Sequence, residues 1–457
     1  MGKERNFSGN INRFFLWEMV EVESSGHPPQ LAGTSDCTKM QCDVGWLCPT
    51  GQYLFVIAPS HFSTVDSQYP PRYISLMKIL QLIEDFGVIG GAENVMLNLL
   101  THLNKDEFES HVAIVTPKSI PPLAVATGAT VHLIQGDGQM NLEVLRQLRG
   151  IVRQNQIDLV HSHLLKMNSY NGPLSRWCGV PGVGSVHGIL PHETTPRARL
   201  FAKFAGALNT RTVVVSRSLA DQYVSTYGVN QSKLVVINNG FDKSRIAPPS
   251  SEAIEEFRRQ HNLQPSAPVV VAVGNVKEVK GYSFLIAAFA RVLKSVPDAR
   301  LFIAGEDSQN KNLGLLSLVT DLGVKDRVIF LGSFDNIALL FSVASLYVCS
   351  SLHEGFSLTT VEAMASQLSV VVTDCGGPAD IVRDKADGLI VPIADSESLA
   401  NAMIRLLTDS ASAKKMGISG RDRAERNFSM DKFIAEHEML YKALIASGRS
   451  KFLDFLK

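Results

Sequence analysis

The chain has 457 residues, of which 45% are apolar, so it is long enough to bury the cores of two or three ordinary domains. Lysine and arginine total 44 and aspartate and glutamate also total 44, which excludes a general attraction to nucleic acid. The sequence contains neither an apolar run of roughly 18 residues, as a membrane span needs, nor a signal-peptide core, so we expect a cytoplasmic protein.

Residues 1–76 have no sustained hydrophobic period and are interrupted by several prolines, so we interpret them as an extension ahead of the first domain. Cys37, Cys42 and Cys48 lie here without the paired spacing of a zinc site. We expect the extension to be dispensable for catalysis, with Met77 a candidate initiator. The alternative is that residues 53–58 form an edge strand or cover an acceptor site.

From Lys78 onward, apolar strands alternate with helical patterns. The first unit is a strand at 79–83, a glycine-bearing loop at 86–91 and a helix at 92–103. Further strands are predicted at 111–115, 130–134, 157–161, 183–187 and 212–215, and the series closes near 234–242. This alternation predicts an α/β domain with a doubly wound parallel sheet over residues 77–243.

A second series follows a proline-rich connection at 243–267 that brackets a charged helical segment. Its strands are predicted at 269–273, 301–304, 328–331, 346–348, 370–372 and 389–391, giving a second parallel-sheet domain over 244–430. An amphipathic helix at 429–446 follows. Ligands of such folds bind at the carboxyl ends of the strands, so we expect the two domains to face a shared cleft.

The stretch 350–365 begins where a buried strand ends. Its loop carries Glu354 and Gly355, and Ser357 or Thr359 can cap a helix that contains Glu362. A helix that begins at a strand end is a ready anion site. Glu362 could accept hydrogen bonds from a ribose diol and Glu354 from a sugar hydroxyl, whereas the plainer alternative is two solvated carboxylates.

Three further positions bear on chemistry. The loop 87–93 has glycines that would let a diphosphate approach the backbone, although it is neither a dinucleotide fingerprint nor a P-loop, and a simple tight turn is the alternative. Lys280 follows the first strand of the second series, where a cation could neutralise a leaving group. His187 ends a strand and could contact a ligand, whereas we interpret His161 and His163 as structural.

A basic amphipathic helix is predicted between residues 197 and 211. On one face, basic side chains flank large apolar ones: Arg197, Arg199, Lys203 and Arg211 beside Leu200, Phe201, Phe204 and Leu208. We expect the apolar stripe to pack on the first sheet. The alternative is peripheral contact with an acidic membrane surface.

Several of these motifs carry a family resemblance. The residues from Glu354-Gly355-Phe356 to Glu362-Ala363-Met364, followed by 370–377 and 388–392, resemble those of the retaining glycosyltransferases of family 4, which share the two-domain GT-B fold. The resemblance extends from about Met77 to the C-terminus. It implies two Rossmann-like domains, the first for the acceptor and the second for the donor, and a final helix over 431–457 that packs back on the first domain.

The resemblance also implies an activity and its residues. It implies a hexosyltransferase of polysaccharide biosynthesis that moves a sugar from a nucleoside diphosphate sugar to a glycan or lipid-linked acceptor, with retention and without a metal or a separate cofactor. A location at the inner face of a membrane is the alternative to a purely cytoplasmic one. The implied catalytic residues are His187, Lys280 and Glu354, and Glu93 lies on the acceptor side. The implied donor-binding residues are Gly90, Gly91, Asn275, Lys280, Glu354, Gly355, Phe356, Ser357, Leu358 and Glu362.

The chain departs from the family pattern at three positions. Asn275 stands where the family usually has arginine, and Gln367 and Ser369 stand where relatives often have glycine and proline. Asparagine brings a donor but no charge, which puts full catalytic strength in doubt. Two other classes therefore stay open: a sugar-nucleotide epimerase of the same fold, and a catalytically weak sugar-nucleotide-binding protein.

Overall fold

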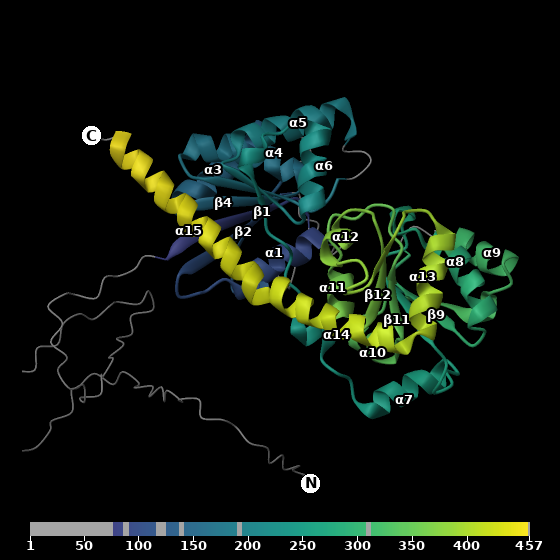
Figure 1. Ribbon diagram of the computed structural model, residues 1–457. Coiled ribbons are helices and arrows are strands. Elements are labelled where there is room, and N and C mark those ends of the chain that lie inside the picture. Colours follow the sequence, from purple (N-terminus) through teal and green to yellow (C-terminus); the bar gives the residue numbers. More distant parts are fainter. Residues whose placement is uncertain are drawn as a thin grey trace, which may run out of the picture. The chain divides into compact units, whose positions relative to one another are not determined.

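A computed structural model describes residues 76–85, 91–115, 125–136, 141–189, 194–307 and 312–455 (Figure 1). The predicted extension, with its three cysteines and the alternative strand at 53–58, lies outside the described residues apart from Leu76. The first strand, β1 (Met77–Ile83), begins immediately after it.

The first sheet has seven strands among the described residues, and all its pairings are parallel. Their spatial order is β3 (Thr130–Ile134), β2 (Phe108–Val115), β1, β4 (Leu159–His163), β5 (Gly182–Val186), β6 (Arg211–Val214) and β7 (Leu234–Val236). The order reverses direction between β1 and β4, which is the topological switch point where ligands of such sheets bind. The predicted doubly wound sheet is confirmed.

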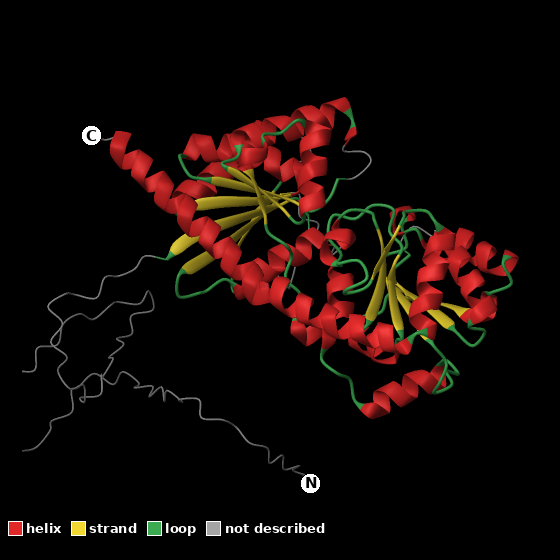
Figure 2. Cartoon of the chain, viewed as in Figure 1, coloured by secondary structure: helices red, strands yellow, loops and turns green. Residues whose placement is uncertain are grey.

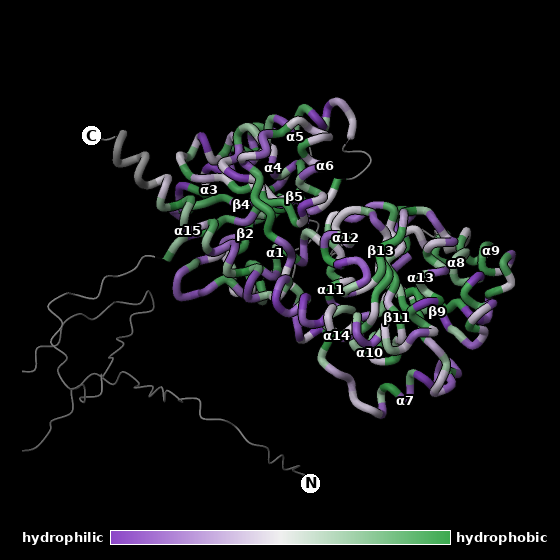
Figure 3. The backbone as a smooth tube through the Cα atoms, in the orientation of Figure 1, coloured by the Kyte–Doolittle hydropathy of each residue, from purple (hydrophilic) through white to green (hydrophobic). Residues whose placement is uncertain are grey.

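Helices lie on both faces of this sheet (Figure 2). They are α1 (Gly91–His102), α3 (Leu142–Gln154), α4 (Leu164–Cys178), α5 (Pro196–Leu208) and α6 (Arg217–Tyr227). The β-branched and leucine-rich strands are therefore covered on both sides, and Figure 3 shows the central strands mainly in green, the hydrophobic end of its scale. Leu80, Leu82 and Val160 are fully buried.

The short 3-10 helix η2 (Gln231–Lys233) leads into β7. The connection to the second sheet then contains the 3-10 helix η3 (Lys243–Ile246) and the helix α7 (Ser251–Gln260). Six parallel strands follow among the described residues, in the order β10 (Val328–Gly332), β9 (Arg300–Ala304), β8 (Val269–Val273), β11 (Leu346–Cys349), β12 (Ser369–Thr373) and β13 (Leu389–Val391). The associated 3-10 helices are η4 (Glu278–Lys280) and η5 (Lys325–Arg327), and the α-helices are α8 (Tyr282–Ser295), α9 (Asn312–Asp321), α10 (Ile337–Val343), α11 (Leu358–Ala365), α12 (Gly377–Ile381), α13 (Ser396–Thr408) and α14 (Ser410–Asn427). Here the switch point lies between β8 and β11.

The last helix, α15 (Met430–Phe455), returns to the first sheet. Its Phe433, Tyr441 and Leu444 share one apolar cluster with Ile79 of β1 and Leu99 of α1. The chain end therefore helps to bury the strand with which the first sheet begins, as Figure 1 shows beside α1 and β2. No helix within the described ranges is both long enough and apolar enough to span a bilayer.

Two local predictions need correction. The strand predicted at 157–161 runs from Leu159 to His163. Ahead of it, the Lys78 N–H of β1 donates to the side-chain carboxylate of Asp158 at 2.9 Å instead of to a backbone carbonyl, so the regular pairing of the two strands begins one residue later. His161 and His163 are consequently both inside the strand and fully buried. His187 lies immediately after β5, as predicted for a strand end.

The face of α5 that packs is not the predicted one. Leu200 and Phe204 are 70% and 43% exposed, and Arg211 begins β6 instead of belonging to the helix. The buried residues of α5 are Ala202, Ala205 and Gly206. Close approach to α4 requires small side chains, because a Cβ at Gly172 of α4 would lie 2.5 Å from Cβ of Leu208.

Candidate functional site

The candidate site is built at the switch point of the second sheet. The Lys280 ammonium, at the end of the segment after β8, donates to Oε1 of Glu354, in the loop after β11, at 2.8 Å. The Ser351 hydroxyl donates to the other oxygen, Oε2, also at 2.8 Å. Both carboxylate oxygens are therefore held, and two predicted catalytic residues that are 74 positions apart form one ion pair.

The ion pair is largely shielded from water, with side-chain exposures of 22% for Lys280 and 14% for Glu354. Burial alone lowers the pKa of the Lys280 ammonium, but attraction to Glu354 and the hydrogen bond to it outweigh burial and raise the pKa above its ordinary value. Lys280 is therefore a permanent cation at neutral pH. A lysine of this kind can neutralise charge that develops on a leaving diphosphate.

Two glycines bring the strand ends close together. A Cβ at Gly355 would lie 2.2 Å from the carbonyl oxygen of His187, and a Cβ at Gly377 would lie 2.2 Å from the carbonyl oxygen of Gly355. No real side chain tolerates such distances, so both positions require glycine. As a result, the backbone after β5 of the first sheet lies directly against the Glu354 loop of the second.

The predicted capping at the start of α11 is confirmed for Ser357. Its hydroxyl accepts a hydrogen bond from the Thr360 N–H at 3.3 Å, and Leu358 is the first helical residue. The Phe356 ring packs against Phe428 with ring centroids 5.7 Å apart. The side chain of Phe356 is thus taken up by the core, and what this segment can offer a ligand is its backbone and the positive end of the helix.

Glu362 lies inside α11, and its side chain is only 4% exposed. Its Oε1 accepts a hydrogen bond from Nε of Arg245 in η3 at 2.8 Å, whereas its Oε2 is buried without a hydrogen-bond partner among the described residues. Burial raises the pKa of this carboxyl, and the Arg245 guanidinium offsets part of that rise. A buried carboxylate oxygen without a donor is costly in the free protein and would be satisfied by a ligand hydroxyl.

The other predicted residues are placed as follows. Asn275 accepts a hydrogen bond from the Glu306 N–H at 3.3 Å through its side-chain oxygen. Gly91 is the first residue of α1 and Glu93 lies in its first turn, while Gly90 is outside the described residues. The sequence analysis did not identify Arg245 or Ser351. Arg245 contacts Glu362, 117 positions away, and Ser351 contacts Glu354, 3 positions away, and no sequence pattern indicates either contact.

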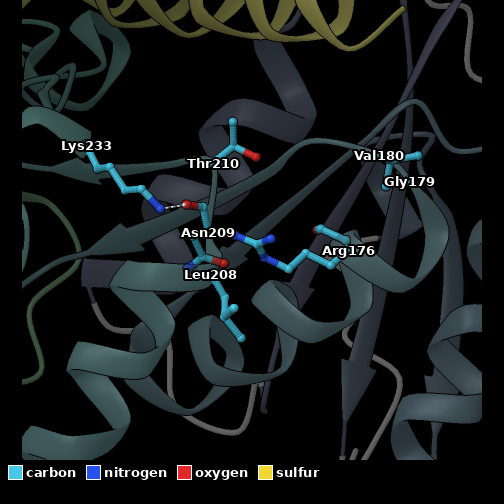
Figure 4. Close-up of a pocket in the computed structure, with 8 residues that line it drawn as sticks. Arg176, Gly179, Val180, Leu208, Asn209, Thr210 and Lys233 are labelled. Carbon is cyan, nitrogen blue, oxygen red and sulfur yellow. Dashed lines mark hydrogen bonds between the residues drawn. The ribbon is translucent and has the colours of Figure 1, made fainter. Parts of the chain in front are cut away.

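A separate pocket of about 350 Å³ lies in the first sheet at the ends where β5 and β6 begin, whereas His187 follows the end of β5 (Figure 4). It is lined by Ser175, Arg176, Gly179, Val180, Leu208, Asn209, Thr210 and Lys233. The Lys233 ammonium donates to the carbonyl oxygens of Ala207 and Asn209 at 2.5 and 3.0 Å, where α5 ends. The Lys233 ammonium therefore satisfies carbonyl oxygens at the C-terminus of α5. None of the predicted site residues lines the pocket.

Two family models match the chain. The model for glycosyl transferases group 1 matches residues 253–423, and that for glycosyltransferase family 4 matches residues 89–245. The D-inositol 3-phosphate glycosyltransferase of Salinispora tropica is 27% identical over 408 residues, which cover 81% of this chain and 84% of that protein. The N-acetyl-alpha-D-glucosaminyl L-malate synthase of Bacillus anthracis is 24% identical over 315 residues, which cover 68% of this chain and 81% of that protein.

Among solved structures, Anabaena Alr3699/HepE in complex with UDP superposes with a TM-score of 0.72 at 22% identity, covering 80% of this chain and all of that one. The same protein in complex with UDP-glucose gives a TM-score of 0.70, with the same identity and coverage. The two parallel sheets and these neighbours define the GT-B fold. Because the matches cover both sheets, the chain belongs to the glycosyltransferases of family 4.

Proposed function

We propose that this chain transfers a hexose from a nucleoside diphosphate sugar to a hydroxyl acceptor, with retention of anomeric configuration. The observation that carries the proposal is a group of three features around α11. They are the largely shielded ion pair of Lys280 and Glu354, the buried carboxylate of Glu362 with one oxygen unpartnered among the described residues, and the helix N-terminus capped by Ser357. A nucleoside diphosphate sugar carries a ribose diol, a diphosphate and a sugar. Each of these parts has a complementary group in this set.

In the proposed complex, Oε2 of Glu362 accepts a hydrogen bond from the ribose. The diphosphate lies between Lys280 and the backbone N–H groups at Ser357 and Leu358, and Glu354 and His187 contact the sugar. The acceptor approaches from the side of Gly91 and Glu93. Support for a nucleotide donor comes from the related fold of Anabaena Alr3699/HepE, which was crystallised with UDP and with UDP-glucose.

The proposal has a direct assay. The full chain is incubated with UDP-, GDP- and ADP-sugars, each with and without glycan and lipid-linked acceptors, and free nucleoside diphosphate is measured. We expect release with one class of donor, and an anomeric coupling in the product that matches that of the donor. Inversion of the anomeric centre would refute retention while leaving transfer intact.

The same assay separates the alternatives. An epimerase would produce a changed sugar nucleotide without free diphosphate. A binding protein would bind a donor in calorimetry and release nothing in any reaction. Lys280→Met removes the cation at the leaving group and should abolish release by a true transferase, while Lys442→Met, a half-exposed lysine of α15 far along the chain from the site, serves as the matched control.

We also propose that α5 places the protein on an anionic membrane, where a lipid-linked acceptor would be met. Leu200 and Phe204 are exposed, and Arg197, Arg199 and Lys203 are exposed on the same helix. The sequence from Pro196 to Arg211 contains no acidic residue. Because α5 follows β5, its start lies on the same sheet edge as His187, so membrane contact and the candidate site are on adjacent parts of the fold.

A vesicle flotation experiment tests this contact. The chain should float with vesicles that contain phosphatidylglycerol and stay with the protein fraction in pure phosphatidylcholine. A double substitution, Leu200→Ser with Phe204→Ser, should remove flotation without lowering the thermal midpoint, because neither side chain is buried. Flotation that survives the double substitution would exclude α5 as the membrane surface.

A further inference from the structure

A continuous chain of buried polar side chains runs through the first sheet to His187. It begins on the C-terminal helix α15 and crosses strands β1, β4 and β5. Its members are Tyr441, Gln81, His161, Ser185, His163 and His187. All of them except His187, which is half-buried, are at most 1% exposed, so the hydrogen bonds within the chain are shielded from water.

The part of this hydrogen-bonded series that lies nearest the candidate site contains two imidazoles and one amide. The Nε2 atom of His163 lies 2.9 Å from Oε1 of Gln81, and the Nδ1 atom of His163 lies 3.2 Å from Nε2 of His187. The planes of the two imidazole rings are nearly parallel, with an interplanar angle of 19° and ring centroids 5.4 Å apart. The Nδ1 atom of His187 has no hydrogen-bond partner among the described residues.

The other half of the chain orients the amide. The Gln81 amide nitrogen donates to Oη of Tyr441 at 3.4 Å, and Oη lies 2.6 Å from Nδ1 of His161. The Nε2 atom of His161 lies 2.8 Å from the Ser185 hydroxyl. Since the Tyr441 hydroxyl accepts from Gln81, its own proton is directed to His161.

With the Gln81 amide in this orientation and the imidazoles neutral, the direction of every hydrogen bond in the series follows. Burial lowers the pKa of His161 and His163 well below the ordinary value and that of His187 to about 4, so all three are neutral at pH 7. With Oε1 of Gln81 as acceptor, His163 must carry its proton on Nε2 and can only accept at Nδ1. His187 must then carry its proton on Nε2, which leaves Nδ1 as a bare acceptor.

We infer that Gln81 and Tyr441 are positioning residues that set the tautomer of His187, so that its unpartnered Nδ1 accepts a hydrogen bond from a donor-sugar hydroxyl. The inference rests on the proposed function for the identity of the ligand, but the tautomer itself is a property of the free protein. The reversed chain is the competing arrangement: a flipped Gln81 amide would donate to His163 and leave His187 with a proton on Nδ1. In that arrangement the Tyr441 hydroxyl would donate to the Gln81 oxygen and accept from His161. The orientation of the Gln81 amide, with Oε1 toward His163 and the nitrogen toward Tyr441, therefore selects between the two.

The tautomer can be read by two-bond ¹H–¹⁵N correlation spectra of the full chain labelled with ¹⁵N-histidine, recorded at pH 7 without any sugar nucleotide. His187→Gln assigns the signal. We expect one tautomer in the wild type, with a pyridine-type Nδ1 and a protonated Nε2. In Tyr441→Phe and in Gln81→Met the constraint is lost, and we expect a mixture of both tautomers at His187.

The control is Tyr170→Phe, which makes the same chemical change at another buried tyrosine, whose oxygen accepts the Asn141 N–H at 2.8 Å. It should leave the His187 tautomer unchanged. An equal mixture halves the competent fraction, so KM for the sugar nucleotide that is most active in the release screen should rise about twofold in Tyr441→Phe with kcat nearly unchanged.

Three results would overturn the inference. A wild-type His187 protonated on Nδ1, or a single unchanged tautomer in both Tyr441→Phe and Gln81→Met, would remove the orienting role of the chain. A changed tautomer with an unaltered donor KM would remove its connection to the sugar. A chain without any transferase activity still gives the tautomer result, so failure of the proposed function is seen separately.

Discussion

Replacement of Glu362 by glutamine should move donor binding and stability in opposite directions. The free protein keeps a buried carboxylate with one oxygen on Arg245 and one oxygen unpartnered. Glutamine has nearly the same shape and can still accept from Arg245, but it carries no charge to desolvate. The charged Glu362 side chain is therefore expected to lower the stability of the free protein while it provides a hydrogen-bond acceptor for the ribose.

The magnitudes follow from hydrogen-bond energetics. A charge-assisted hydrogen bond contributes roughly 1.5–3 kcal/mol and a neutral one roughly 0.5–1.5 kcal/mol, so Glu362→Gln should weaken donor binding by about 1 kcal/mol, close to fivefold. Glu362→Ala removes the acceptor and should cost the full 1.5–3 kcal/mol, about 10- to 150-fold. Relief of the buried charge should raise the thermal midpoint of Glu362→Gln by about 1–2 °C.

The pH dependence gives an independent check on the sign. Because burial raises the pKa of the folded Glu362 carboxyl above 4.5, the native state binds its proton more readily than the unfolded chain does. The charged form therefore costs stability at pH 7, and this cost disappears as the pH falls through the folded pKa and then below 4.5. The stability advantage of Glu362→Gln should be largest at neutral pH and should vanish near pH 4.

Calorimetric titration with the most active donor measures the affinity, and thermal unfolding at several pH values measures the stability. Glu425→Gln is the matched control, because Glu425 is a partly exposed helical glutamate whose carboxylate pairs with Arg421 on the same helix. Unchanged donor affinity in Glu362→Gln would remove Glu362 from the binding site. A lower thermal midpoint at pH 7 would contradict the view that its second oxygen is unsatisfied.

Three further predictions concern other parts of the chain. Burial lowers the pKa of His437 to about 4, so the native state resists the protonation that the unfolded chain accepts below pH 6.5. The free energy of unfolding should therefore fall as the pH drops from 6.5 to 4. His437→Gln should reduce the slope of unfolding free energy against pH by about 1.4 kcal/mol per pH unit, whereas the same change at the exposed His102 should not. Asn275→Arg should raise donor affinity or transfer rate by adding a cation beside Lys280; if both fall, the loop is built around the hydrogen bond between Asn275 and the Glu306 N–H. A chain starting at Met77 should match the full chain in thermal midpoint and transfer, because the described core begins in β1; loss of soluble protein or of activity would show that the preceding residues belong to the fold.

The sequence by itself determined the elements and their chemistry. Runs such as 269–273 and 370–372 are short, apolar and β-branched, which predicts buried parallel strands, and their alternation with helices predicts the doubly wound order. The cap at the start of α11 was predicted as Ser357 or Thr359, and the structure selects Ser357; capping could be predicted because it depends only on residues within one helical turn. These signals are local, so they survive without knowledge of the fold.

Only the tertiary structure decided which side chains meet. Arg245 reaches Glu362 across 117 positions, and Gln81 reaches Tyr441 across 360, because the sheet order and the return of α15 bring those segments together. The exposure of Leu200 and Phe204 was likewise decided by packing, since the close approach of α4 selects the small face of α5 and turns the large side chains outward. Partners and exposed faces depend on the neighbours that the fold supplies, and no periodicity within a single segment encodes them.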